Sequence, residues 1–225
     1  MFDLHKSNIG RNLGAILALL RDALGDEIHW PDKSQRQRKM NAFMQDFPEV
    51  VAIVDATEQP IQRPQDQETQ KAHYSGKKKR HTLKTQVVVG PDGELMHVSE
   101  TVPGSQHDKN LYDESGVGDN LEEGEAMMGD SGYQDIQHAH PAALPFKKPK
   151  GKELTQEQKE HNRCLSRIRV VAENTLAQIK TFRVMAHVYR HRRDGYNVRF
   201  RIVAALVNRR IRRRPLRRTA PSLTA

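Results

Sequence analysis

Three acidic residues stand at positions where a carboxylate can take part in chemistry. Asp55 follows an apolar, β-branched run at residues 50–54, and Asp130 ends a shorter run at residues 125–129. Acids at the ends of buried strands lie beside the crevice in which α/β sheets bind ligands. Glu173 lies next to the apolar face of a helical pattern, so it points toward the sheet or its border. Acids gathered at one place repel each other unless cations lie among them, and paired hard cations catalyse phosphoryl transfer.

Each acid also has an ordinary structural explanation. Asp55 is able to cap a turn with Thr57, and Asp130 is able to cap the turn that follows it. Glu173 is four residues from Arg169, which is the spacing of a helix-surface ion pair. For a single acid, each of these roles is more common than metal binding. The residue pattern by itself therefore leaves both interpretations open.

Other kinds of metal or disulfide site have little support. Cys164 is the single cysteine, which excludes an intrachain disulfide and a Cys-rich zinc site. His138 and His140 are two residues apart in a polar stretch, and no His-x-x-x-His spacing is accompanied by a helper acid. Carboxylates are ligands for hard cations, so the expected cofactor is a pair of Mg²⁺ or Mn²⁺ ions.

The composition favours a nucleic-acid partner. Lys and Arg total 37 against 28 acids, which gives a formal net charge of +9 and a pI of about 9.7. Such a charge fits binding to a polyanion. No apolar run approaches the roughly 20 residues of a membrane span, and the first residues lack the layout of a signal peptide. We therefore expect a cytoplasmic protein with no membrane partner.

Basic residues gather in a few runs that are suited to phosphate contacts. The last of these, at residues 209–218, holds seven arginines and belongs to a tail expected to be disordered. The alternative for each run is a solvated loop that binds nothing. The predicted DNA contacts are Lys77, Lys78, Lys79, Arg80, Lys84, Arg190, Arg192 and Arg193.

Hydrophobic periodicity predicts the sheet that must position the acids. The run at residues 50–54 is a strand buried on both faces and is expected to stop at Asp55. Residues 82–89 and 94–102 form a hairpin, because Gly-Pro-Asp-Gly at 90–93 is strong turn chemistry. The first strand is expected to pair with this hairpin, and the strand that ends at Asp130 reaches the other side of the sheet.

Helices are predicted around this sheet, which makes the fold an α/β arrangement with a mixed sheet. Ser7 is the expected cap of an N-terminal helix, Ser105 of a helix after the hairpin, and Thr155 of a long helix through a capping box. The predicted helices cover residues 5–24, about 40–44, a segment from 105, 155–180 and 196–211.

Five short motifs, taken together, resemble one protein family. They are VVAIVDATE at 50–58, YSGKKKRHTLK at 74–84, GSQHD at 104–108, GDSGYQ at 129–134, and VAEN at 171–174 followed by KTF at 180–182. In this order they are similar to bacterial insertion-sequence transposases related to eukaryotic Harbinger elements. The resemblance runs from about residue 48 to 211 and implies an RNase H-like mixed sheet flanked by helices.

The resemblance implies a catalytic triad of Asp55, Asp130 and Glu173, with a pair of divalent ions. Asp108 also matches a family acid and is expected to be an auxiliary ligand or a helix cap; Asp130 is preferred in the triad because it ends a strand. The implied activity is cleavage of double-stranded DNA at transposon ends and strand transfer into target DNA, with a homodimer as the expected partner state. The alternatives are a metal-dependent nuclease without strand transfer, an inactive DNA-binding remnant, and an RNA-binding module.

The resemblance also divides the chain. Residues 1–47 are expected to hold a partial helix-turn-helix-like segment and a linker, residues 48–211 the RNase H-like catalytic domain, and residues 212–225 the basic tail. Residues 3–13 look like the turn and recognition helix of a helix-turn-helix whose first helices are missing. We therefore expect an N-terminally shortened form of such a transposase.

Overall fold

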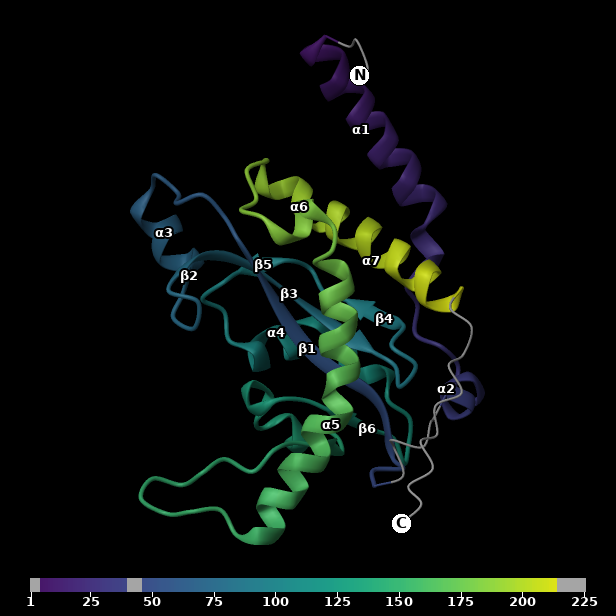
Figure 1. Ribbon diagram of the computed structural model, residues 1–225, viewed down its shortest axis with the longest axis vertical. Helices are drawn as coiled ribbons and strands as arrows, with labels where there is room; N and C mark the ends of the chain where they lie inside the picture. The colour runs from purple at the N-terminus through teal and green to yellow at the C-terminus, as the bar shows by residue number, and fades with distance from the viewer. Residues whose placement is uncertain (1–4, 40–45, 214–225) are drawn as a thin grey trace, which may run out of the picture.

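A mixed sheet lies at the centre of the computed structural model, which describes residues 5–39 and 46–213 (Figure 1). Its strand order is β2-β3-β1-β6-β7, with β4 and β5 also pairing with β3. The strands are β1 (Val50–Pro60), β2 (Tyr74–Ser75), β3 (Arg80–Val89), β4 (Leu95–Val98), β5 (Val102–Pro103), β6 (Ala126–Met128) and β7 (Ala142–Ala143).

The central position predicted for residues 50–54 is confirmed. β1 is antiparallel to β3 on one side and parallel to β6 on the other. β3 continues the antiparallel part by pairing with β4, across a turn in which Gly93 has a φ of 87°. That positive φ is a conformation that glycine adopts at little cost, so it explains the turn residue.

One predicted strand, residues 94–102, is divided into two. The amide of Gln86 donates to the side-chain oxygen of Ser99 at 3.0 Å, and that hydroxyl donates to the carbonyl of Glu100. A side chain thereby replaces a backbone partner in the ladder with β3. β4 ends at Val98 and β5 begins at Val102 for this reason.

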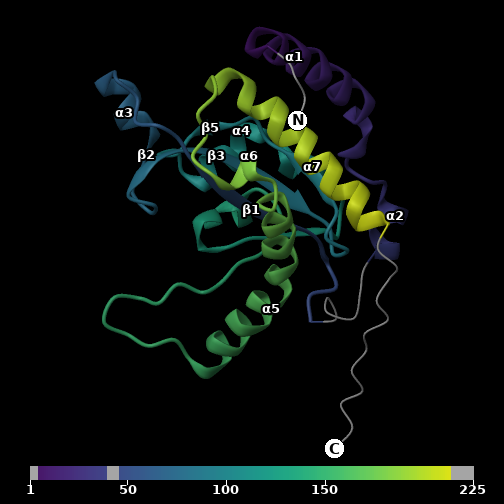
Figure 2. The ribbon, with the colours of Figure 1, turned by 45° about the horizontal axis from the view of Figure 1, so that its top comes forward.

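Helices cover both faces of the sheet, as Figures 1 and 2 show. α5 and α7 pack on one face, where Ile53 and Val87 meet apolar residues such as Ile168 and Val203. α4 and short 3-10 turns pack on the other, where Val54 and Val88 lie in one cluster with Tyr112 and Tyr133. The helices are α1 (Lys6–Ala23), α2 (Lys33–Lys39), α3 (Gln67–His73), α4 (Asp108–Ser115), α5 (Gln156–Ile179), α6 (Arg183–Ala186) and α7 (Tyr196–Arg212).

The chain passes through α4 between the antiparallel hairpin and β6. It then returns parallel to β1, and β6 pairs in parallel with β7. Three antiparallel strands followed by two parallel ones, with helices on both faces, make the RNase H-like α/β fold that the sequence predicts.

One of the three helix-capping predictions is confirmed and two are wrong. Thr155 and Gln158 form the predicted capping box at the start of α5. The prediction for Ser105 is wrong, because α4 begins at Asp108 with His107 as its cap and no side-chain cap bond. The prediction for Ser7 is also wrong, since α1 begins one residue earlier and Ser7 lies inside it.

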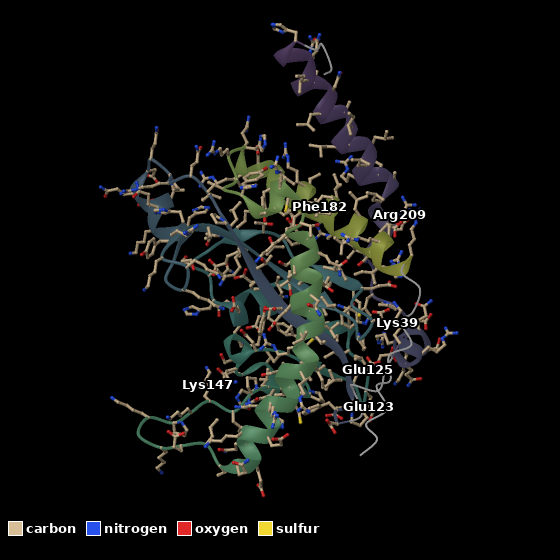
Figure 3. The ribbon with its side chains drawn as sticks, viewed as in Figure 1. Lys39, Glu123, Glu125, Lys147, Phe182 and Arg209 are labelled. Carbon is tan, nitrogen blue, oxygen red and sulfur yellow. The ribbon has the colours of Figure 1, made fainter. Side chains whose placement is uncertain are left out.

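The N-terminal segment packs on this body. The C-terminal end of α1 lies near α7 (Figures 1 and 2), where Leu24 forms an apolar cluster with Ile202 and Ala205. α2 is held by the buried guanidinium of Arg36, which lies 2.7 Å from a carboxylate oxygen of Glu125. Figure 3 shows Glu125 beside α2. The predicted helix at 40–44, and the predicted tail from residue 214 on, lie outside the described residues.

Candidate active site

Asp55 lies in the middle of β1 rather than at its end. The predicted stop at Asp55 is wrong, because residues 53 to 60 continue the antiparallel ladder with β3. Successive side chains of a strand alternate between faces, so Asp55 is on the face of Ile53, which α5 covers. Its Oδ1 accepts a 2.8 Å hydrogen bond from the amide of Ala56. The turn with Thr57 is not formed, since both residues are in β1.

Asp130 lies near Asp55, just beyond the C-terminal end of the neighbouring strand β6. Ile53 is the register partner of Met128, and the two acids each follow two residues later on parallel strands. Asp130 comes just after β6, as predicted. Its Oδ1 accepts a 2.7 Å hydrogen bond from the amide of Gly132, so it also caps the short turn after the strand. A carboxylate that caps a turn through one oxygen keeps a second oxygen that is able to accept a bond or bind a cation.

Glu173 is placed by α5 on the same side. Its neighbour Ala172 is buried against the sheet, and Glu173 lies at the border of that contact. No ion pair joins Glu173 to Arg169 in the described part of the chain, so the surface-pair alternative is not realised. The positive charge of Arg169 instead acts on Asp55, and its Nε atom is buried without a hydrogen-bond partner.

One pocket of about 350 Å³ brings these groups together. Asp55 comes from the central strand β1, Asp130 from just beyond the end of β6 and Glu173 from helix α5. All three line the pocket. None of the three forms a salt bridge with any residue in the ranges 5–39 and 46–213. The positively charged residues of the lining are Lys77, Lys78, Arg169 and Lys180.

Ionisation of Asp55, the acid on the central strand, is unfavourable in this pocket. Burial raises the pKa of the Asp55 carboxyl, and the negative charges of Asp130 and Glu173 raise it further. Burial also lowers the pKa of the Lys180 ammonium, as does the positive charge of Lys78. A carboxyl group that resists ionisation and a lysine that resists protonation, both through burial in one pocket, are typical of a functional site.

Asp108 stands apart from these three acids. It does not line the pocket, and its Oδ1 lies 2.7 Å from the ammonium of Lys84. It nevertheless approaches Asp130 around Gly132, because a Cβ built on this glycine would be 2.6 Å from Asp108 Oδ2 and 2.9 Å from Asp130 Oδ1. Asp108 is also the first residue of α4, where its negative charge interacts favourably with the helix dipole.

The prediction of Lys84 as a DNA contact needs correction. Its side chain is buried, and its ammonium is held by Asp108 and by the carbonyl of Gln106 at 2.5 Å. A cation engaged in this way is not available to a phosphate. The other predicted DNA contacts are exposed: Lys77, Lys78, Lys79, Arg80, Arg190, Arg192 and Arg193.

These exposed cations form two neighbouring groups. Lys77 and Lys78 line the pocket directly. Residues 190–193 follow α6, and the chain there is joined to the end of β1 through a hydrogen bond from Tyr189 to the carbonyl of Pro60. The guanidinium of Arg193 lies 3.4 Å from the ring of His73 in α3, which connects this segment to the elements around β2.

Two further residues of the pocket lining, Arg169 and Lys180, are not among the predicted site residues. Arg169 was recognised as a helix-surface partner, and Lys180 as part of a motif, but neither was placed at the acids. Tyr133 has a fully buried hydroxyl without a hydrogen-bond partner, beside the charges of Asp108, Asp55 and Asp130. The available signal was helical spacing, since residues 169, 173, 176, 177 and 180 all line the pocket from α5 and its end.

The donor set fits a hard divalent cation. It consists of carboxylates without a histidine or cysteine. Within residues 5–39 and 46–213, however, no three such side chains are gathered closely enough to form a closed metal cage. Ions would therefore have to draw the carboxylates of Asp55, Asp130 and Glu173 together.

No helix among the described residues has the length and apolar character to cross a bilayer.

Comparison with known proteins identifies the family. The chain is 38% identical over 161 residues to the probable transposase for insertion sequence element IS702 of Microchaete diplosiphon, which covers 71% of this chain and 57% of that protein. The chain thus spans little more than half the length of this curated relative. No solved structure matches it significantly. The model of the family described as DDE superfamily endonuclease matches residues 54–208, a range that holds Asp55, Asp130 and Glu173. Because that match covers more than half of the chain, this protein belongs to the DDE superfamily endonucleases, in agreement with the resemblance to insertion-sequence transposases.

Proposed function

We propose that this protein cleaves DNA strands at the ends of an insertion sequence and joins the freed 3′ ends to target DNA, with the help of divalent metal ions. The observation that carries the proposal is the convergence of Asp55, Asp130 and Glu173 in one pocket with cations around them. The relative described as a probable transposase supports the same reaction. We assign this activity to residues 48–211.

The three acids would hold the ions, as Mg²⁺ or Mn²⁺ and in a pair. When bound, such ions supply an activated water at neutral pH and stabilise the leaving oxygen of the phosphodiester. The chain's own part is to fix the ligands. Asp55 is fixed by a strand with partners on both sides, and Asp130 by the amide of Gly132. We propose Asp108 as a group that limits the position of Asp130 across Gly132, rather than as the second aspartate of the triad.

Basic side chains would position the DNA. Lys77 and Lys78 lie on the lining of the pocket with the acids, and Lys180 faces them from the end of α5. Point charges of this kind contact phosphates without reading bases. We extend the same role to Lys79, Arg80 and the exposed arginines at 190, 192 and 193. Two copies acting on paired ends at the nucleoid complete the proposal.

The decisive experiment is nicking of supercoiled plasmid with and without Mg²⁺ or Mn²⁺. Wild-type protein should nick only with the ion. Asp55→Asn, Asp130→Asn and Glu173→Gln should each lower the rate by orders of magnitude and leave DNA binding intact. Glu157→Gln is the matched control, because Glu157 is exposed in the first turn of the same helix.

Different outcomes separate the competing functions. Pre-cleaved insertion-sequence ends that become joined to a target plasmid would support a transposase, whereas nicking without joined products would leave a nuclease. DNA binding without nicking in any variant would favour the inactive remnant. Equal nicking by wild type and by the three acid variants would reject the triad.

A further inference from the structure

The chain makes an excursion beyond the sheet between β1 and β3. Residues 61–79 contain α3 and β2, and they extend past the ends of those strands (Figure 1). Within this excursion lies a second hollow, an open groove of about 710 Å³. It is separate from the pocket that holds the acids, since the two share no lining residue.

One face of α3 and the residue after it form the wall of this groove. Gln67, Gln70, Lys71 and Tyr74 line it, at the spacing of residues that share one helix face. Arg63 and His81 line it from the flanking segments, and no acidic residue does. The groove is therefore polar, with positive charges that no lining acid neutralises.

The exposed aromatic ring in the groove needs an explanation. Tyr74 is 44% exposed, and its ring meets that of His81 edge-on with 5.7 Å between ring centres. Aromatic rings beside cations are the surfaces on which nucleic-acid bases stack. Gln67 and Lys71 form no side-chain hydrogen bond with any residue that the structure describes. An amide that is free to donate and accept is suited to the edge of a base.

Other groups in the excursion hold the groove in shape. Arg63 Nε donates to the amide oxygen of Gln70 at 2.9 Å, and the amide nitrogen of Gln70 donates to the carbonyl of Gln65 at 3.2 Å. Asp66 is engaged as the cap of α3, where it accepts a hydrogen bond from the amide of Thr69 at 2.7 Å, and Glu68 in the first turn of α3 does not line the groove. The groove is thus braced on one side and leaves Gln67, Lys71 and Tyr74 to a ligand.

The position of the groove connects it to the reaction. Tyr74 lines the groove, and only three residues later Lys77 lines the pocket with the acids. The loop 76–79 therefore follows the groove-lining Tyr74 closely in the chain and brings Lys77 and Lys78 to the pocket. This short connection offers a DNA strand whose phosphate lies at the acids a route to the groove.

We infer that the α3 groove binds the nucleotides that flank the cleaved phosphodiester and contacts their bases through Tyr74 and Gln67. This inference rests on the proposed DNA cleavage, and it adds base contacts to a surface otherwise made of phosphate contacts. Bases held here distinguish one flanking sequence from another, which the lysines of loop 76–79 do not do.

Photo-cross-linking tests the inference in the wild-type chain. Duplexes carry 5-iododeoxyuridine at successive positions on both sides of the cleavage point, and the cross-linked residue is identified by mass spectrometry in Ca²⁺. Cross-links should map to Tyr74 from a few neighbouring positions. Tyr74→Ala should weaken binding of flanked duplexes by roughly tenfold, the usual size of a lost stacking contact, while Tyr74→Phe should restore it.

A matched control and a parallel assay keep the outcomes distinct. Phe146 is also exposed, at 48%, and also packs on a histidine, with 4.9 Å between its ring and that of His161, so Phe146→Ala should leave binding unchanged. Metal-dependent nicking without a Tyr74 cross-link overturns the groove and leaves the proposed function. Tyr74 cross-links without nicking support the groove and count against the enzyme. Absence of DNA binding overturns both.

Discussion

The ammonium of Lys84 lies 2.7 Å from Asp108 Oδ1, and both side chains are largely buried, with 9% and 19% exposed. This pair neutralises the one family acid that does not line the pocket, and it removes Lys84 from the set of phosphate contacts. A carboxylate in a salt bridge has less need of a metal ion than Asp55, Asp130 or Glu173, none of which forms a salt bridge with another described residue.

Lys84→Met should destabilise the fold, because it leaves the Asp108 charge without its partner. The expected loss in the free energy of unfolding is about 2–3 kcal/mol, below the range of fully buried pairs since Asp108 keeps some solvent contact. Urea unfolding measures it, and Asp108→Asn in the same chain should recover part of the loss. Lys109→Met is the control: it removes the exposed partner of Asp113 in α4, the helix that Asp108 begins. This change should cost about 0.5 kcal/mol or less. Equal losses for both lysines would contradict this account.

Gly132→Ala should disable the site while the fold survives. The added methyl group would meet Asp108 Oδ2 at 2.6 Å and Asp130 Oδ1 at 2.9 Å, so one or both carboxylates must move. We expect about 1–3 kcal/mol of lost stability and a much larger relative loss of Mg²⁺-dependent nicking. Gly25→Ala is the control, because a methyl group there meets nothing within 4 Å. A Gly132→Ala protein with wild-type nicking would show that the positions of the Asp108 and Asp130 carboxylates do not affect the reaction.

The sequence was sufficient for most of the sheet. A continuous β-branched run allows few positions other than a central strand, and Gly-Pro-Asp-Gly allows little other than a turn. Strand ends were less predictable, since Asp55 and the polar residues after it give no apolar signal. They remain in β1 because backbone bonds to β3 hold them, and that pairing is a tertiary effect.

The site was predictable in its acids and less so in its cations. Asp130 and Glu173 follow from their positions at a strand end and on a helix face. Lys84 was misjudged, because its neighbours in sequence are basic while its neighbour in space is Asp108. The hydroxyl of Tyr133 is buried by a turn that no periodicity reveals.

Asp55→Asn should stabilise the metal-free protein increasingly as pH rises. The pKa of Asp55 is raised by burial and by its acidic neighbours, so its ionised form is disfavoured in the fold. Its contribution to stability is present below the unfolded pKa, about 3.9, and is lost as pH rises through the folded pKa. The free energy of unfolding in urea and EDTA, compared with wild type from pH 4 to 7, measures the difference.

A control with the opposite sign strengthens this measurement. Hydrogen bonds at the start of α3 lower the pKa of Asp66, so its contribution is present at neutral pH and is lost on acidification. Asp66→Asn should therefore differ from wild type in the reverse direction. Added Mg²⁺ should raise the melting temperature of wild type and not of Asp55→Asn. A pH-independent difference for Asp55→Asn would argue against a costly ionised carboxylate.

Replacing Lys77, Lys78 and Lys79 together by alanine should weaken DNA binding to all sequences about equally. Each lost phosphate contact should reduce the slope of log affinity against log salt by roughly 0.9. Anisotropy titrations at several salt concentrations measure this slope. The change should also lower nicking, since Lys77 and Lys78 line the pocket with the acids.

The matched control removes the same charge elsewhere. Lys147, Lys150 and Lys152 are exposed in the loop before α5, and Figure 3 shows Lys147 in that loop. Thirteen residues of helix (169 − 156), roughly 20 Å, separate Gln156 at the start of α5 from Arg169, the first residue of that helix in the pocket. Alanine at these three positions should alter the slope much less than alanine at 77–79, because a long-range field is screened within about 10 Å at ordinary salt. Equal slopes for the two triple variants would indicate that residues 77–79 form a solvated loop without phosphate contacts. DNA binding would then depend on the net charge of the protein rather than on specific contacts beside the acids.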